Sequence, residues 1–174
     1  MSASPSYHPF YCEENVARWL ASASGERYAL FITNAARQVP LWEQRLSSGG
    51  DPLIWDYHVV GITRGPDRVW DFDSRLPFPS PLAAYLRATF PPLSVDAAVL
   101  APRFRLVDSE AFARTVATDR RHLRRPDGSW MQSPPPWPAI GAGHTLDRFL
   151  DLEDSIAGEV LSLEGLRKRL GTKG

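Results

Sequence analysis

The chain has 174 residues, which suits a single domain with a sizeable hydrophobic core. Its 20 basic and 20 acidic residues cancel, so charge gives no reason to expect a nucleic-acid or membrane surface. The single cysteine excludes an intramolecular disulfide and is typical of a reducing compartment. Because no signal peptide or membrane-spanning run is recognisable, we expect a soluble, cytoplasmic protein, with access to the nucleus in a eukaryotic cell.

The first predicted element is an amphipathic helix. Apolar residues recur at helical spacing between residues 12 and 23, and Gly25 ends the pattern. Glu13 and Glu14 then lie in the first turn, where carboxylates stabilise the positive end of the helix dipole. Cys12 opens the helix, so its thiol is expected to be partly exposed.

Strands dominate the middle of the chain and helices the remainder. Strand patterns occur at 27–33, 38–44, 52–62 and 69–73, with a turn after the first strand and a hairpin turn at 64–68 before the last. The later elements are a helix over 79–90, a strand over 103–107, a helix over 108–125 and a short basic helix over 162–171. One helix, mostly antiparallel strands and then further helices indicate an α+β fold. No linker divides residues 1–174, so one domain is expected.

The predicted hairpin brings a histidine close to two acids. Alternation along its first strand places His58 on a largely apolar face, and Asp71 and Asp73 share one face of the partner strand. If the turn centres on Gly65 and Pro66, His58 lies opposite Asp73 and diagonal to Asp71. A turn one residue earlier in each arm places it opposite Asp71. Both neighbours are within side-chain reach, so a histidine–carboxylate pair is predicted with either acid.

A thiol at a helix start, a strand histidine and an acid are the parts of a cysteine hydrolase. The helix dipole and a nearby imidazolium favour the thiolate of Cys12, and the acid fixes the tautomer of His58. Backbone N–H groups at the helix start can hold an oxyanion. The structural alternative is a cysteine that serves as a small buried hydrophobe and a histidine bonded in the core. Zinc-ligand spacing is missing, so no metal and no cofactor are predicted.

Five stretches, in chain order, resemble the protein N-terminal glutamine amidohydrolase family: YCEEN, WDYHVV, DFDSRLPFP, FRLVDSEAFARTVATDRRHL and PPPWPAI. The Trp-Asp-Tyr-His-Val stretch at 55–59, with the cysteine block upstream, is the most specific. The resemblance runs from about Tyr7 to Leu170. It implies a papain- and transglutaminase-like α+β fold, in which an N-terminal helix that carries the cysteine packs against an antiparallel sheet.

The resemblance also implies a triad, with Cys12 as nucleophile, His58 as base and Asp71 as the orienting acid. Family members often carry another cysteine two residues before the nucleophile, where this chain has Phe10; the mechanism does not need it. The implied reaction is deamidation of an N-terminal glutamine to glutamate with release of ammonia. The implied partners are peptides or proteins that begin with glutamine, in the degradation route that reads protein N-termini. A monomer that needs no cofactor is expected.

Other activities could use the same triad. A transglutaminase, a general glutaminyl deamidase and a cysteine peptidase are the enzymatic alternatives, and a non-enzymatic reader of N-termini is the alternative from another class. For the family activity, an acid near the triad must bind the α-ammonium of the substrate. Glu13 and Asp73 are ranked above Asp56 and Asp119, because each lies within two residues of a triad member.

The remaining conspicuous residues are predicted to be structural. Trp55 and Tyr57 fall on the strand face opposite His58 and are expected to pack in the core. His122 and Asp119 are expected to serve the end of a helix rather than the site.

Overall fold

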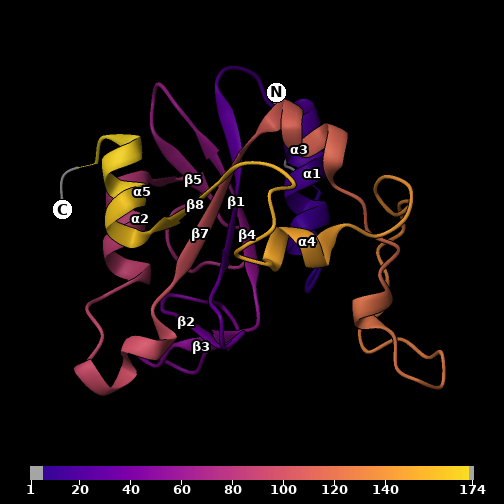
Figure 1. Cartoon of the computed structure of the whole chain (residues 1–174), viewed down its shortest axis with the longest axis horizontal. Helices are drawn as coiled ribbons and strands as arrows, with labels where there is room; N and C mark the ends of the chain where they lie inside the picture. Colours follow the sequence, from indigo (N-terminus) through magenta and orange to yellow (C-terminus); the bar gives the residue numbers. More distant parts are fainter. Residues whose placement is uncertain (1–5, 173–174) are drawn as a thin grey trace.

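The computed structural model describes residues 6–172 and shows an α+β fold, which confirms the predicted class (Figure 1). Its main sheet has six strands in the order β6-β5-β4-β1-β7-β8, and all neighbouring pairs are antiparallel. These strands are β1 (Arg27–Thr33), β4 (His58–Thr63), β5 (Arg68–Trp70), β6 (Ser80–Pro81), β7 (Arg103–Asp108) and β8 (Glu159–Ser162). A second sheet pairs β2 (Val39–Leu41) with β3 (Leu53–Trp55).

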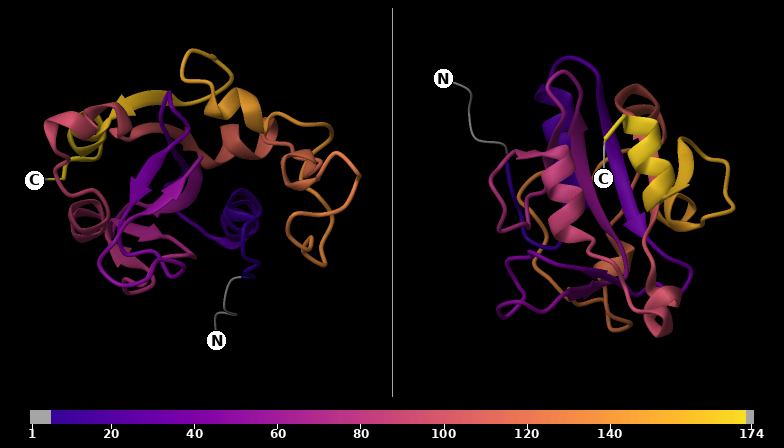
Figure 2. Two further views of the ribbon diagram at one scale, coloured as in Figure 1. Left: turned by 90° about the horizontal axis from the view of Figure 1, so that it is seen from below. Right: turned by 90° about the vertical axis from the view of Figure 1, so that its left-hand side faces the viewer.

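Helices cover both faces of the main sheet. In Figure 1, α1, α3 and α4 lie to the right of the strands and α2 and α5 to the left, and the right-hand view of Figure 2 shows α2 and α5 in front of the sheet. The helices are α1 (Cys12–Ser22), α2 (Leu82–Thr89), α3 (Ser109–Thr115), α4 (Leu146–Leu150) and α5 (Leu163–Leu170), with 3-10 turns η1 (Val95–Leu100) and η2 (Arg121–Leu123). Within residues 6–172, none of the helices is long and apolar enough to span a membrane.

The central strand β1 contributes to two hydrophobic cores. Leu30 and Ile32 face the core beneath α2 and α5, whereas Ala29 and Phe31 face the core beneath α1, α3 and α4. Phe31 stacks on Phe149 of α4, with 4.7 Å between ring centroids. Because β1 is buried on both faces and pairs with β4, it fixes the position of β4 beneath α1.

The strand predicted over 52–62 is two separate strands. β3 belongs to the small sheet, and β4 begins only at His58. Between them the Oδ1 atom of Asp56 accepts a hydrogen bond from the backbone N–H of Tyr57, and the carbonyl of Asp56 accepts one from Thr33. These bonds hold a bend, so the predicted alternation of faces does not continue through it. β1 and β2, predicted as neighbours in the chain, likewise lie in different sheets.

The hairpin of β4 and β5 has the first of the two predicted registers. Gly61 faces Trp70, which centres the turn on residues 65–66. Because β5 ends at Trp70, Asp71 and Asp73 lie just beyond the paired segment. Both acids are therefore held by their own hydrogen bonds and not by the strand ladder.

The helix predicted over 108–125 is too long. α3 ends at Thr115, because the backbone N–H of Ala117 bonds to the side chain of Thr145 and cannot continue the helical pattern. The short elements β6, β8, α4 and η1 were not predicted, since a few residues carry too little periodicity to detect. The helices near 82–89 and 163–170 are confirmed.

The close packing of α1 on β4 gives a first prediction. A methyl group at Gly61 would lie 2.2 Å from the ring of Trp19, so Gly61→Ala forces the helix away from the sheet. We expect a loss of roughly 1–3 kcal/mol in the free energy of unfolding, the usual cost of overpacking. Chemical denaturation measures it. Adding Trp19→Leu to Gly61→Ala should restore part of the loss, because the smaller side chain leaves room for the methyl group. Equal losses in Gly61→Ala and in the double variant would contradict the assigned contact.

Candidate active site

The nucleophile candidate, Cys12, is the first residue of α1. Just before it, Phe10 adopts a left-handed backbone conformation with φ 68°, and the side chain of Asn15 exchanges two hydrogen bonds with the backbone of His8. These contacts fold the preceding chain against α1 and fix where the helix starts. Cys12 is only 4 % exposed and packs between α1 and the sheet. The prediction of a partly exposed thiol is therefore wrong.

The base candidate, His58, pairs with Asp71. The Nε2 atom of His58 lies 2.8 Å from Oδ1 of Asp71, and both side chains are buried. The ring of Trp55 stacks on the imidazole, with 4.9 Å between centroids and 22° between planes. This arrangement directs Nε2 at the acid. In the part of the chain that the structure describes, the buried Nδ1 atom has no hydrogen-bond partner, so it is the nitrogen available for proton transfer.

Asp71 is held by four donors. Its Oδ2 atom accepts hydrogen bonds from Tyr85 at 2.8 Å and Gln44 at 3.2 Å, and Oδ1 also accepts one from the backbone N–H of Asp73. Burial opposes the charge of Asp71, but His58 and these donors outweigh it and lower the pKa of the carboxyl. Burial also opposes a charge on His58, but Asp71 raises the pKa of the imidazole overall. Asp71 therefore stabilises the imidazolium form of His58 when the ring takes up a proton.

A second buried acid, Glu13, lies beside the thiol. Its Oε2 atom accepts hydrogen bonds from the hydroxyl of Tyr57 at 3.1 Å and from the Cys12 thiol at 3.6 Å. Its Oε1 atom lies 3.5 Å from Nε2 of His122 but, within residues 6–172, makes no hydrogen bond. Burial raises the pKa of Glu13 to about 7. This carboxylate therefore has unused capacity to accept hydrogen bonds.

Asp73 is a third buried acid near the site. Its Oδ1 atom accepts a hydrogen bond from the hydroxyl of Tyr7 at 2.7 Å. Its Oδ2 atom is buried and finds no hydrogen-bond partner among the described residues. Burial raises the pKa of this carboxyl, although His58 and Tyr7 act in the opposite direction.

The thiol is uncharged in this environment. Burial raises the pKa of Cys12 well above its ordinary value, and the carboxylates of Glu13 and Asp73 raise it further. A hydrogen bond with the backbone of Val59, the residue after His58 on β4, opposes them. The sequence-based prediction relied on the helix dipole and the imidazolium to favour a thiolate. Burial, together with the two buried carboxylates, outweighs those effects.

Comparison with known proteins identifies the family. A model of the N-terminal glutamine amidase family matches residues 7–170. A protein N-terminal glutamine amidohydrolase of Arabidopsis thaliana is 40% identical over 161 residues, which cover 82% of this chain and 73% of that protein. The enzymes of the same name from Danio rerio and Homo sapiens are 32% and 30% identical, over 96% of this chain and 90% and 88% of their own lengths. The chain belongs to the N-terminal glutamine amidase family. It is therefore a hydrolase that acts on amide bonds.

The other glutamate of the first turn has a different environment in this amidase. Glu14 is buried, and its carboxylate pairs with the guanidinium of Arg120 at 2.7 and 2.8 Å. The indole N–H of Trp137 donates to it as well, at 2.8 Å. These bonds attach the segment after α3, which extends beside α1 in Figure 1, to the start of the helix. Glu14 is thus fully paired, in contrast to Glu13.

Sequence reasoning missed several residues of the amidase site. Tyr57 packs in the core as predicted, but its hydroxyl also contacts Glu13. His122, predicted to serve a helix end, lies 3.5 Å from Glu13 and 3.2 Å from the hydroxyl of Tyr57. Trp55 is half-buried against the core, but it stacks on the ring of His58 and does not lie on the opposite face as predicted. The remaining site residues without a prediction are Tyr7, Gln44 and Tyr85. A lone tyrosine or glutamine carries no positional signal, because only the fold brings it to the site.

The two lower-ranked acids lie at the surface of the amidase. Asp119 is bonded to Arg121, and Asp56 is exposed, with one carboxylate oxygen bonded to the backbone of Tyr57. Neither carboxylate contacts Cys12, His58 or Asp71 in a bond that the structure shows. Their lower ranking agrees with this placement.

The ligand atoms of His58, Asp71 and Asp73 lie within 4.8 Å of one another, a spacing that a metal ion could use. The Nε2 atom of His58 and Oδ1 of Asp71, however, already bond to each other at 2.8 Å, and Oδ2 of Asp71 accepts bonds from Tyr85 and Gln44. We therefore assign the cluster to the histidine–carboxylate pair.

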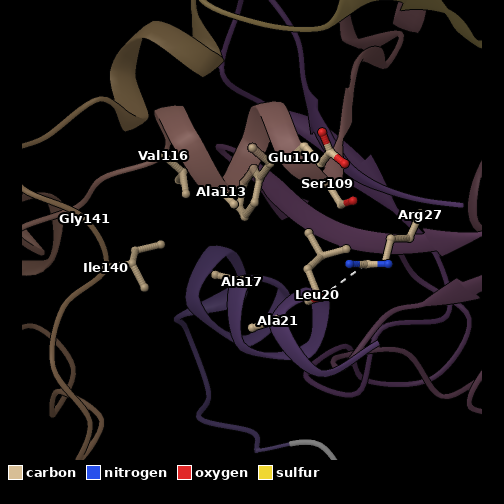
Figure 3. A pocket seen from close by; sticks show the side chains of 11 residues that line it. Ala17, Leu20, Ala21, Arg27, Ser109, Glu110, Ala113, Val116, Ile140 and Gly141 are labelled. Carbon is tan, nitrogen blue, oxygen red and sulfur yellow. Dashed lines mark hydrogen bonds between the residues drawn. The ribbon is translucent and has the colours of Figure 1, made fainter. Parts of the chain in front are cut away.

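A separate hollow lies on the outer side of α1 and is shown in Figure 3. Residues of α1 and α3 and the chain near Ile140 line it, and its charged members are Arg27 and Glu110. Arg27 is already bonded to the carbonyl of Leu20 at 3.2 Å, the dashed line in Figure 3. The hollow includes none of the acids beside Cys12, so we do not place the substrate of the amidase there.

The buried charge of Glu13 predicts a pH-dependent effect on stability. Its pKa rises from an ordinary 4.5 to about 7, so the folded protein binds this proton more tightly than the unfolded chain. The contribution of Glu13 to stability is then greatest below pH 4.5 and decreases by roughly 3 kcal/mol as the pH rises past 7. Glu13→Gln should be more stable than the unaltered chain at pH 8 by about 1–3 kcal/mol, with little difference at pH 4.

Denaturant unfolding at the two pH values measures this difference. Glu110→Gln, which changes an exposed acid of α3, is the matched control and should show no such dependence. A Glu13→Gln protein that is less stable than the unaltered chain at pH 8 would contradict the assignment of an uncompensated charge.

Proposed function

We propose that the chain deamidates N-terminal glutamine to glutamate, with release of ammonia, through Cys12, His58 and Asp71. The observation that carries the proposal is the combination of a buried thiol with two buried carboxylates that each have an oxygen without a hydrogen-bond partner. The thiol suits attack on an amide, and the free oxygens suit a cation. An N-terminal glutamine brings both an amide and an ammonium. The match to enzymes named for this activity supports the same substrate.

The α-ammonium is assigned to Glu13 and Asp73. The two carboxylates act on the same thiol, since both raise the pKa of Cys12, and each has a free oxygen. An ammonium between them supplies the hydrogen bonds that these oxygens lack and offsets their negative charge. This favours ionisation of the thiol, so binding of the correct substrate also activates the nucleophile. A substrate without the charge leaves the thiol neutral.

Acylation starts when the thiol proton passes to Nδ1 of His58. The sulfur attacks the side-chain carboxamide carbon, and the backbone N–H of Cys12 at the start of α1 donates to the oxyanion. The imidazolium returns its proton to the departing nitrogen, which leaves as ammonia, and a thioester to Cys12 remains. Asp71 stabilises the imidazolium throughout and fixes the ring orientation.

Deacylation uses the same groups in reverse. A water molecule gives a proton to His58 and attacks the thioester carbon, and the carbon–sulfur bond breaks to leave the γ-carboxylate of glutamate. The thiolate regains a proton from the imidazolium.

The helix that carries the nucleophile and the antiparallel sheet that carries His58 support assigning the fold to the papain- and transglutaminase-like kind.

The general glutaminyl deamidase, the transglutaminase and the peptidase remain the competing activities. None of them requires a cation site beside the nucleophile, because their substrates react at internal residues. The unpaired oxygens of Glu13 and Asp73 therefore favour a substrate with a free N-terminus.

The two acids next to His58 should respond differently to substitution. Asp71→Asn removes the charge that supports the imidazolium, and we expect kcat to fall by about 10²–10⁴, as in related triads. Asp73→Asn removes one anion from the ammonium site and should mainly raise KM. Steady-state ammonia release from a Gln-initiated peptide separates the two effects. A larger loss of kcat in Asp73→Asn than in Asp71→Asn would show that the roles are reversed.

Four peptides that differ only at their start test the substrate: Gln, Asn, acetyl-Gln and Gly-Gln. We expect ammonia from the first alone. Asparagine is one methylene shorter, and misplacing the reacting carbon by about 1 Å costs roughly 10²-fold or more in rate. Acetylation removes the cation and leaves the acids unpaired, which costs about 3–5 kcal/mol. Cys12→Ala supplies the background, and comparable release from acetyl-Gln or Gly-Gln would indicate a general deamidase or a transglutaminase.

A further inference from the structure

The carboxylates assigned to the α-ammonium lie very close to the reacting atoms. The Oε2 atom of Glu13 is 3.6 Å from the Cys12 sulfur that would carry the thioester. An ammonium that contacts this carboxylate therefore lies on the same side of the site as the thioester, and only three carbons of the substrate separate its nitrogen from the thioester carbon. The five atoms from the α-nitrogen to the side-chain carbonyl carbon of glutamine can close a ring. The intermediate thus contains its own competing nucleophile.

Ring closure would yield a different product. A neutral α-amine attacks the thioester carbon, the carbon–sulfur bond breaks, and the amine proton passes to His58 and then to the thiolate. The product is a pyroglutamyl peptide, and no water is consumed. Hydrolysis instead adds one water and gives the glutamyl peptide. Both routes release the same ammonia in the first step, so an ammonia assay does not distinguish them.

Protonation decides between the two routes, because an ammonium has no lone pair for attack. The free α-amine of a peptide has a pKa of about 7.7–8.0, so a large fraction is neutral in slightly alkaline solution. An adjacent carboxylate raises an amine pKa by roughly 1–3 units. Glu13 and Asp73 are buried, and each has an oxygen free of hydrogen bonds in the described chain. They can therefore hold the proton on the substrate through both steps.

We propose that Glu13 and Asp73 set the product of the reaction, by holding the α-nitrogen as an ammonium so that water, and not this nitrogen, resolves the thioester. This inference rests on the proposed function and adds a second role for the same two acids. The groups that face them are Tyr57, His122, Cys12 and Glu14 at Glu13, and Tyr7, Arg45 and the His58–Asp71 pair at Asp73. The other anions among these, Glu14 and Asp71, are paired with Arg120 and His58, so neither is free to replace a missing carboxylate.

The test measures the ratio of pyroglutamyl to glutamyl peptide by mass spectrometry, where the two products differ by one water. Glu13→Gln and Asp73→Asn are compared with the unaltered chain and with Asp56→Asn, which changes an exposed acid near β4. Cys12→Ala gives the spontaneous cyclisation of the peptide, which is subtracted. At pH 8 we expect the pyroglutamyl fraction to rise roughly tenfold or more in the two site variants and to stay unchanged in Asp56→Asn.

A variant that releases ammonia with an unchanged product ratio overturns the inference. If both site variants are inactive, the pH dependence of the product ratio in the unaltered chain tests the inference. Its pyroglutamyl fraction should stay low through pH 8 and rise only above roughly pH 9. A rise near pH 8 would show that the site does not hold the proton, and no rise even at pH 10 would show that geometry alone prevents closure; either result overturns the inference. If the unaltered chain releases no ammonia above the Cys12→Ala background, the proposed function itself has failed.

Discussion

A carboxylate buried next to Cys12, the proposed nucleophile, is the constraint on which the rest of the candidate site depends. Glu13 and Glu14 are adjacent and both fully buried, yet only Glu14 has a complete set of partners, led by Arg120. Removing a carboxylate from water costs several kcal/mol unless charge and hydrogen bonds compensate it. Bonds from Arg120 and Trp137 compensate the charge of Glu14 within the protein, and they attach the segment after α3 to α1. Glu13 is not compensated in this way, and burial raises its pKa to about 7. In the proposed function, the α-ammonium of the substrate supplies the missing partner.

The proposed catalytic pair of His58 and Asp71, in contrast, is held in place by other groups of the protein. His58 is fixed by the stack of Trp55 and by Asp71, which in turn accepts bonds from Tyr85 and Gln44. Such a network holds the imidazole in one tautomer and one orientation before any substrate arrives. The chain therefore combines a rigidly held imidazole with a proposed binding site in which two carboxylates each have an oxygen without a hydrogen-bond partner. This division is what an enzyme needs if its specificity is to come from a charge on the substrate.

Sequence reasoning succeeded where the pattern is local. The helix that opens at Cys12 follows from periodicity, and the hairpin has one of the two registers that the turn allows. The choice of Asp71 over Asp73 as the partner of His58 comes from the family resemblance and not from the register. Sequence reasoning failed where contacts between segments far apart in the chain determine the local conformation. The bend before His58 depends on a hydrogen bond from Thr33, and Trp55, expected on the strand face opposite His58, instead stacks on its ring. Burial of the thiol was also unpredictable, because it depends on how the chain before α1 folds back.

The same failure explains why the charge state of the thiol could not be read from its position on the helix. A helix N-terminus favours a thiolate by the field of its dipole, worth at most about 2 kcal/mol. Burial and a carboxylate at 3.6 Å act in the opposite direction and outweigh it. A neutral thiol is a poor nucleophile and is also protected from oxidation. In the proposed mechanism, the α-ammonium that binds Glu13 removes this restraint, so the residue that recognises the N-terminus also controls when the cysteine becomes reactive.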